Sequence, residues 1–428
     1  MRGYWLFIAF ESLIMHLLLP TDALAMSESV YVGFICINAL ILVFVLVNKY
    51  SNDRNFVVLI IGGLFLRLVF MFWSEYCSHI FTLPNSGADE LTYYYNAMSN
   101  MVKGKEFTGY AQFFAWQANI YGLSKIYGKF INVLLSVSAI TILRRILINL
   151  DIDYNVQTKT MAFACFLPNY AILSSLLLRE SAIIFLVAVS AYYFIAWWQK
   201  HDFKNLLFSL IASVIAAWLH SGMIAYALGI LCVAVTSRRT IDGRRYSLTS
   251  ICTLLLTVIT SVVILVVLMN TNLGLTSYFR GAETVSDIVS IADAYEDGGS
   301  AYNANIVSND STAGFIINTP LRMLYFMFAP VPWDWRSATD AIAFVFSGLF
   351  YGYVFFKAIP YVFKKERYPL VSALFLIALL LLLIFGWGVS NSGTALRHRD
   401  KMVIHYLLLF ALMQNNRVMG RRAINRRY

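Results

Sequence analysis

Apolar stretches of about 20 residues recur along the whole chain, separated by short polar segments. A membrane-spanning helix needs roughly 20 consecutive, mostly apolar residues. Twelve stretches fit this pattern, at about 4–20, 29–48, 55–74, 128–149, 159–178, 181–198, 204–220, 222–237, 248–270, 338–358, 368–388 and 402–415. Another apolar stretch, at about 315–330, is interrupted or flanked by Pro320, Pro330 and Pro332. The pattern predicts an all-α, polytopic transmembrane bundle of about twelve spans.

Basic residues cluster on one side of this map when successive spans alternate in direction. With a cytoplasmic N-terminus, the inside segments become 49–54, 144–145, 200–204, 238–245, 364–367 and the tail 417–427. This distribution follows the positive-inside rule. It requires that 315–330 does not cross the bilayer. We therefore expect a re-entrant or surface-lying helix there, which is tolerated where it is buried in protein or lines a cavity.

The first 25 residues fit two interpretations. The apolar stretch before Ala23-Leu24-Ala25 resembles a secretory signal peptide with its cleavage site. Glu11 and His16 interrupt that stretch, which favours a short first span.

Composition narrows the class of protein further. Hydrophobic residues make up 59% of the 428 positions and charged residues 13%, against roughly 45–50% and 25% in soluble domains. The net charge of +10 comes from basic residues scattered in short loops. The positive-inside bias accounts for it, and no nucleic-acid partner is expected. The sequence predicts one integral-membrane domain over 1–428, multi-pass, with both termini cytoplasmic.

Three longer segments fall on the outer side, at about 75–127, 271–337 and 389–401. Long loops in compact proteins are often functional. The first contains Asp89 and Glu90 directly before an aromatic run. A carboxylate at a membrane face can act as a general base if its surroundings bring its pKa near the operating pH. The alternative is an ordinary solvated pair.

Charged and imidazole side chains also fall at the outer ends of spans. Arg179 and Glu180 stand at the boundary between two spans, where charges usually face a bundle interior or an aqueous cavity; a plain hairpin tip is the alternative. His220 ends the next outward span. Arg67, in contrast, lies within a span and needs a buried partner or a cavity.

Arginines occur in four separate outer segments. Each provides a forked, permanently charged donor suited to phosphate, although any one could be a snorkelling interface anchor. We expect an anionic ligand such as a lipid phosphate at the outer face. The candidate binding residues are Arg179, Glu180, His220, Arg322, Arg336, Arg397, His398 and Arg399, with Arg280 in the same region. The acids Asp293, Glu296, Asp297 and Asp310 have no recognisable metal-binding spacing, so no metal ligands are assigned and a divalent-cation requirement is left open.

In order along the chain, these motifs resemble those of the GT-C superfamily of membrane glycosyltransferases, especially bacterial relatives of protein O-mannosyltransferases. Asp89, Tyr93 and Ala97 resemble an acid followed by a D-x-x-x-Y-x-x-x-A-like run. Residues 121–122 and 132–134 resemble the entry into the next span. Residues 168–180 resemble a P…SS…RE stretch, 320–333 a re-entrant segment, and 393–399 a late G…R-x-R pattern. The likeness covers about 85–405. This sequence departs from the family pattern at two points. Three spans precede the acidic loop here, whereas the family usually has one, and Asp400-Lys401 follow the R-x-R where the family often has proline.

The resemblance implies a GT-C-like fold and a polyprenyl-phosphate-linked sugar donor. Asp89 would be the base that activates an acceptor hydroxyl, with Glu90 supporting it. Arg179, Arg322, Arg397 and Arg399 would bind the departing lipid phosphate. The implied partners are the lipid-linked donor, a lipid-linked glycan or other acceptor, and membrane lipids, and the implied location is the bacterial inner membrane, in assembly of surface polysaccharide or glycoconjugates.

Two alternatives share much of this pattern. An O-antigen or capsule repeat-unit polymerase also has many spans and arginine-rich outer loops, and it joins two polyprenyl-diphosphate-linked oligosaccharides. A transporter or flippase of lipid-linked sugars would carry charges along the midplane of its spans and internal repeats. Here only Arg67 and Glu11 lie mid-span and no repeat is evident, which ranks transport third.

Overall fold

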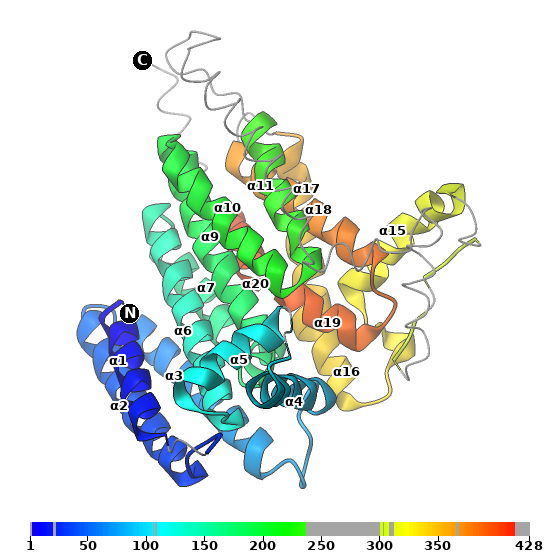
Figure 1. Cartoon of the computed structure of the whole chain (residues 1–428). Coiled ribbons are helices and arrows are strands. Elements are labelled where there is room, and N and C mark those ends of the chain that lie inside the picture. The colour runs from blue at the N-terminus through cyan, green and yellow to red at the C-terminus, as the bar shows by residue number, and fades with distance from the viewer. Residues whose placement is uncertain are drawn as a thin grey trace. The chain divides into compact units, whose positions relative to one another are not determined.

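The computed structural model describes residues 2–19, 23–105, 107, 109–236, 300–302, 304–307, 312–364 and 368–415. Several predicted features lie outside these residues: the span at 248–270, the basic segment 238–245, Arg280, the four acids between 293 and 310, residues 365–367, and the tail from 416 onwards. The regular secondary structure of the described part is helical (Figure 1).

Six of the described helices are long and apolar enough to cross a membrane: Glu28–Lys49, Arg54–Tyr76, Lys125–Asn149, Glu180–Lys200, Ala338–Val362 and Pro369–Trp387. Four shorter apolar helices cover Gly3–Leu18, Phe203–Leu219, Ser221–Thr236 and Val403–Gln414. The prediction of an all-α fold is therefore confirmed for the residues that the structure describes, and their long apolar helices are of the kind that a membrane protein has. The number of twelve spans stays a prediction.

The chain divides into two compact units. The first comprises Met1–Arg145 with Tyr154–Phe185, and the second Ile146–Asp153 with Leu186–Tyr428. The helices that build the first unit are α1 (Arg2–Leu18), α2 (Glu28–Lys49), α3 (Arg54–Tyr76), α4 (Ala88–Lys103), α5 (Tyr110–Tyr121), α6 (Lys125–Asn149), α7 (Tyr154–Phe166), α8 (Pro168–Leu173) and the start of α9 (Glu180–Lys200).

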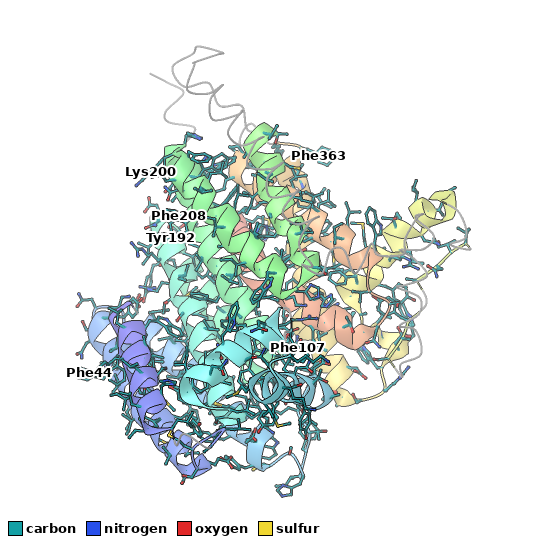
Figure 2. All side chains as sticks on the ribbon, in the orientation of Figure 1. Phe44, Phe107, Tyr192, Lys200, Phe208 and Phe363 are labelled. Atoms are coloured by element: carbon teal, nitrogen blue, oxygen red, sulfur yellow. The ribbon has the colours of Figure 1, made fainter. Side chains whose placement is uncertain are left out.

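Polar side chains inside the first unit are paired with polar groups of neighbouring helices. Asn38 of α2 donates to both carboxylate oxygens of Glu11 in α1, at 2.7 and 2.6 Å. Asp53 caps α3 by accepting from the amide of Phe56 at 3.1 Å, and it also pairs with Arg144 of α6. In contrast, Phe44 of α2 is 69% exposed and points away from its helix (Figure 2), as expected of a lipid-facing side chain.

The mid-span Arg67 is fully buried, and each nitrogen of its guanidinium has at least one hydrogen-bond acceptor. Its Nε donates to the hydroxyls of Ser136 and Ser174, both at 2.9 Å. Its terminal nitrogens donate to the carbonyls of Gly63, Ala164 and Cys165 at 2.8–3.3 Å. The predicted need for a buried partner is thus met by neutral oxygens.

The stretch 159–178, predicted as one span, is divided in the structure. Helix α7 ends at Phe166, α8 begins at Pro168 and ends at Leu173, and an irregular segment continues to Arg179. Proline lacks the amide that would continue the hydrogen bonding of α7 and is well tolerated at the first position of α8. The side chains from Ser174 to Leu178 are nevertheless fully buried.

The first predicted outer loop, 75–127, is largely helical. It contains α4 and α5 (Figure 1). The two helices pack against each other through the edge-to-face rings of Tyr93 and Tyr110, whose centroids lie 4.9 Å apart. Buried apolar residues such as Ala97 on α4, and Phe114 and Ala118 one helical turn apart on α5, give these helices an inward face. The segment is therefore a folded part of the first unit.

The second unit contains the last turn of α6, from Ile146, and α9 from Leu186 onwards. Its further elements are α10 (Phe203–Leu219), η1 (Ser221–Met223), α11 (Ile224–Thr236), α15 (Thr312–Phe328), η2 (Pro332–Asp334), α16 (Ala338–Ala343), η3 (Phe344–Gly348), α17 (Leu349–Val362), α18 (Pro369–Trp387), α19 (Ser392–Asp400) and α20 (Val403–Gln414). Helix α15 runs through Pro320 without ending there. The proline-rich stretch is thus a helix of 17 residues, and its placement in the bilayer remains a prediction.

Candidate functional site

The candidate site of the first unit lies where α4 begins. Gly87 precedes the helix with φ +118°, a conformation that suits glycine. Its amide donates to Glu90 Oε2 at 3.4 Å, so the third residue of the helix caps the first turn. Asp89 and Glu90 both stand in this turn, where negative charge is favoured by the helix dipole.

The two adjacent carboxylates have different surroundings. Glu90 is 5% exposed. Its Oε1 accepts from the amide of Leu177 at 2.8 Å and lies 3.2 Å from the Lys129 ammonium. Asp89, on the other side of the turn, is exposed. Of the two predicted catalytic acids, Glu90 is therefore held by the protein, while Asp89 is accessible to a substrate.

A network of opposite charges continues from Glu90 into α6 and α3. Lys129 is fully buried and also contacts Ser74 Oγ at 2.9 Å and Glu75 Oε2 at 2.8 Å. The other oxygen of Glu75 pairs with Lys125 at 2.9 Å. Two carboxylates and two ammonium groups therefore balance each other at the point where α3 ends and α6 begins.

Asn132, one turn further along α6, holds the irregular segment before α9. Its amide nitrogen lies 2.7 Å from the carbonyl of Leu176 and 2.8 Å from that of Leu178. It also lies 2.9 Å from the phenol oxygen of Tyr110. Burial raises the pKa of Tyr110 above its usual range, so this phenol stays neutral.

Arg179 and Glu180 follow directly after that segment. The Leu177 amide that bonds Glu90 is only two residues before Arg179, so Asp89 and Arg179 belong to the same end of the first unit. Glu180 is fully buried in the first turn of α9. Arg179 is half-buried, and among the described residues its guanidinium has no salt bridge; its Nε has no hydrogen-bond acceptor there. An arginine in this state can bind an anion from outside the protein.

The remaining predicted site residues belong to the second unit. Arg322 donates to Asn305 Oδ1 at 2.8–3.0 Å and to the Trp387 carbonyl at 3.4 Å.

The rings of His220 and His398 meet edge to face at a centroid distance of 4.5 Å, beside Phe385. Arg397 is half-buried in α19. Arg336 is exposed near the start of α16.

Arg399 is fully enclosed by the second unit. Its guanidinium donates to the carbonyls of Phe326 and Met327, both at 2.8 Å, and of Ala329, and its Nε to Ser347 Oγ at 3.2 Å. Burial lowers the pKa of Arg399 to about 10, so the side chain remains charged at neutral pH. In this conformation its donors are directed at the C-terminal end of α15.

Sequence reasoning did not single out Lys129 and Glu75 as groups that support the site, nor Lys125 as their neighbour outside it. The available signal was weak: Lys125 and Lys129 are one helical turn apart at the edge of an apolar span, and Glu75 closes another span. Charges at such positions call for a buried partner. Lys129 and its two carboxylates are 39 and 54 residues apart in the sequence, so only the fold identifies the pairs.

No family model, curated protein or solved structure matches this chain.

Proposed function

We propose that the protein is an integral-membrane glycosyltransferase that takes its sugar from a polyprenyl-phosphate-linked donor on the extracytoplasmic face. The observation that supports this best is that an exposed carboxylate, Asp89, and a half-buried arginine, Arg179, both lie next to the hydrogen bond between Glu90 and Leu177. Both are joined to the same fixed structure, because Glu90 and Leu177 are hydrogen-bonded to each other. The order of the GT-C-like motifs along the chain suggests the reaction class, which is transfer of a glycosyl group from a lipid carrier.

In the proposed reaction, the Asp89 carboxylate accepts the proton of an acceptor hydroxyl. The acceptor oxygen attacks the anomeric carbon as the bond from that carbon to the phosphate oxygen breaks. The electron pair of the broken bond leaves with the polyprenyl phosphate, and direct displacement inverts the anomeric configuration. Arg179 binds the departing phosphate, and stabilising charge that grows during the reaction lowers its barrier.

The geometry divides the other predicted residues by role. Glu90 fixes the helix turn that carries Asp89 and has no free face toward a substrate. Arg399 is engaged by the carbonyls of α15, and Arg322 by Asn305 and Trp387. In this proposal Arg397, Arg336, His220 and His398 remain candidates for binding the lipid-linked substrates, and the enzyme resides in the bacterial inner membrane.

The test is transfer of radiolabelled sugar from polyprenyl-linked donors, using the full chain solubilised in detergent with a membrane lipid extract as donor and acceptor source. We expect transfer in the wild type. In Asp89→Asn, which keeps the size of the side chain but removes the base, we expect a loss of at least about 100-fold, within the usual contribution of general-base catalysis. Asp202→Asn, which alters an acid that caps α10, is the control and keeps its activity.

The product distinguishes the related functions. One added sugar supports a single-sugar transferase, and a ladder of repeats supports a repeat-unit polymerase. Full transfer by Asp89→Asn would rule out the role of this carboxylate. Absence of transfer in detergent, together with movement of labelled lipid across a vesicle membrane, would replace the proposal with a flippase.

A further inference from the structure

Lys129 makes the most complete set of ionic contacts in the described part of the first unit. Its ammonium group has three N–H donors and no acceptor. The three partners, Ser74 Oγ, Glu75 Oε2 and Glu90 Oε1, lie at 2.9, 2.8 and 3.2 Å. The side chain is fully buried. Three oxygens therefore surround the ammonium group, and the cation connects the end of α3 with the first turn of α4.

The neighbouring Lys125 provides a natural comparison. It lies four residues earlier on the same face of α6 and pairs with the other oxygen of Glu75 at 2.9 Å. Its side chain is 30% exposed, and its salt-bridge partner belongs to α3 rather than α4. A pair that water reaches in this way contributes less to stability than a fully buried one, because water screens it.

We propose that Lys129 is a positioning residue that fixes the first turn of α4, and with it the reactive end of the site. The connection runs from Lys129 to Glu90 and from Glu90 to the Leu177 amide. Asp89 precedes Glu90 by one residue, and Arg179 follows Leu177 by two. A single buried cation thus sets the relative placement of both groups, an inference whose catalytic part rests on the proposed function.

Removing Lys129 has a defined electrostatic consequence. Glu75 keeps Lys125 as its partner. Glu90 keeps the amides of Leu177 and Gly87 but loses its cation, so a buried carboxylate remains without charge compensation, which is costly. Movement of Glu90 toward water at the first turn of α4 relieves this cost. The same movement displaces Asp89 from the substrate.

The experiment compares Lys129→Met, Lys125→Met and the charge-balanced double variant Lys129→Met/Glu90→Gln in the full chain. For Lys129→Met we expect kcat to fall by about 100-fold, the cost of misplacing a reacting group by about 1 Å. The donor KM should change by less than about threefold, because Arg179 remains in place on its own segment. Lys125→Met should keep wild-type kcat.

The double variant separates positioning from stability. It removes both buried charges, so its melting temperature should return towards that of the wild type, while kcat stays low because α4 is no longer tied to α6. Recovery of both quantities would overturn the positioning role, and so would a Lys129→Met enzyme with wild-type kcat.

A second measurement does not depend on sugar transfer. Amide hydrogen exchange of residues 87–91 and of Leu177, whose acceptor is Glu90, should accelerate at least tenfold in Lys129→Met and remain unchanged in Lys125→Met. If wild-type protein transfers no sugar but these amides respond as expected, the proposed function fails and the anchoring by Lys129 holds. Equal exchange in the two variants would refute the anchoring itself.

Discussion

Arg67 and Arg399 are both completely buried, and both donate to main-chain carbonyls at the C-terminal end of a helix that stops shortly before a proline. Arg67 contacts Ala164 and Cys165 near the end of α7, and Arg399 contacts Phe326, Met327 and Ala329 at the end of α15. The last carbonyls of a helix lack intrahelical partners, and a cation is favourable at that end. Both arginines therefore act as helix caps.

Replacing Arg67 should destabilise the protein. In Arg67→Met, three carbonyls and two serine hydroxyls lose a charged donor in a dry interior. Each buried group left without a partner costs about 1–3 kcal/mol, so we expect a loss of about 3 kcal/mol or more, measured as thermal unfolding in detergent. Arg145→Met, at an exposed position on α6, should change stability by less than about 0.5 kcal/mol. Equal melting temperatures for the two variants would contradict the capping role.

At the scale of elements, the irregular segment between α8 and α9 shows what the sequence could and could not predict. The apolar pattern of 159–178 is the same for a continuous span and for a buried segment with side-chain partners. Pro168 marked the break, but the groups that satisfy the freed backbone come from elsewhere: Asn132 in α6 and Glu90 in α4. Asp89 and Arg179 could be predicted as site residues from the sequence because each lies close to the end of a span. Lys129 and Glu75 could not, because they are far apart in the sequence and only the tertiary structure brings them together.

Asn132 should be important for this segment. Asn132→Leu keeps the number and branching of the side-chain heavy atoms but leaves the carbonyls of Leu176 and Leu178 without their donor. At about 1–3 kcal/mol for each unsatisfied group, the expected loss is about 2–4 kcal/mol in thermal unfolding. Asn149→Leu, at the exposed other end of α6, is the matched control and should unfold close to the wild type. A stable Asn132→Leu protein would mean that the segment holds its shape without this side chain.

At the scale of the whole molecule, the distribution of basic residues makes a prediction about sidedness that the helices alone do not test. The described part contains six helices able to cross a bilayer by length and composition. The charge map places Asp89, Arg336 and Thr394 outside, and Asn52 and Arg145 inside, with cytoplasmic termini. All five positions are exposed, so each can report on the compartment it faces.

Single cysteines at these five positions, introduced after replacing the five native cysteines, provide the measurement. In intact cells a membrane-impermeant maleimide should label positions 89, 336 and 394. Positions 52 and 145 should react only after lysis. Labelling of 89 and 394 from opposite sides would invalidate the map and, with it, the extracytoplasmic site.

The residues that accept hydrogen bonds from Arg67 are synthesised at different times. All except Gly63 follow it in the chain, and the most distant, Ser174, is 107 residues later. At synthesis rates of about 5–20 residues per second, roughly 5–20 s pass before that residue exists. During this interval α3 carries an uncompensated guanidinium, which costs about 2.5–3.5 kcal/mol at the centre of an inserting helix. The nascent α3 is therefore expected to remain beside the insertion machinery until α6 and α7 arrive, so that these helices enter the bilayer as a group.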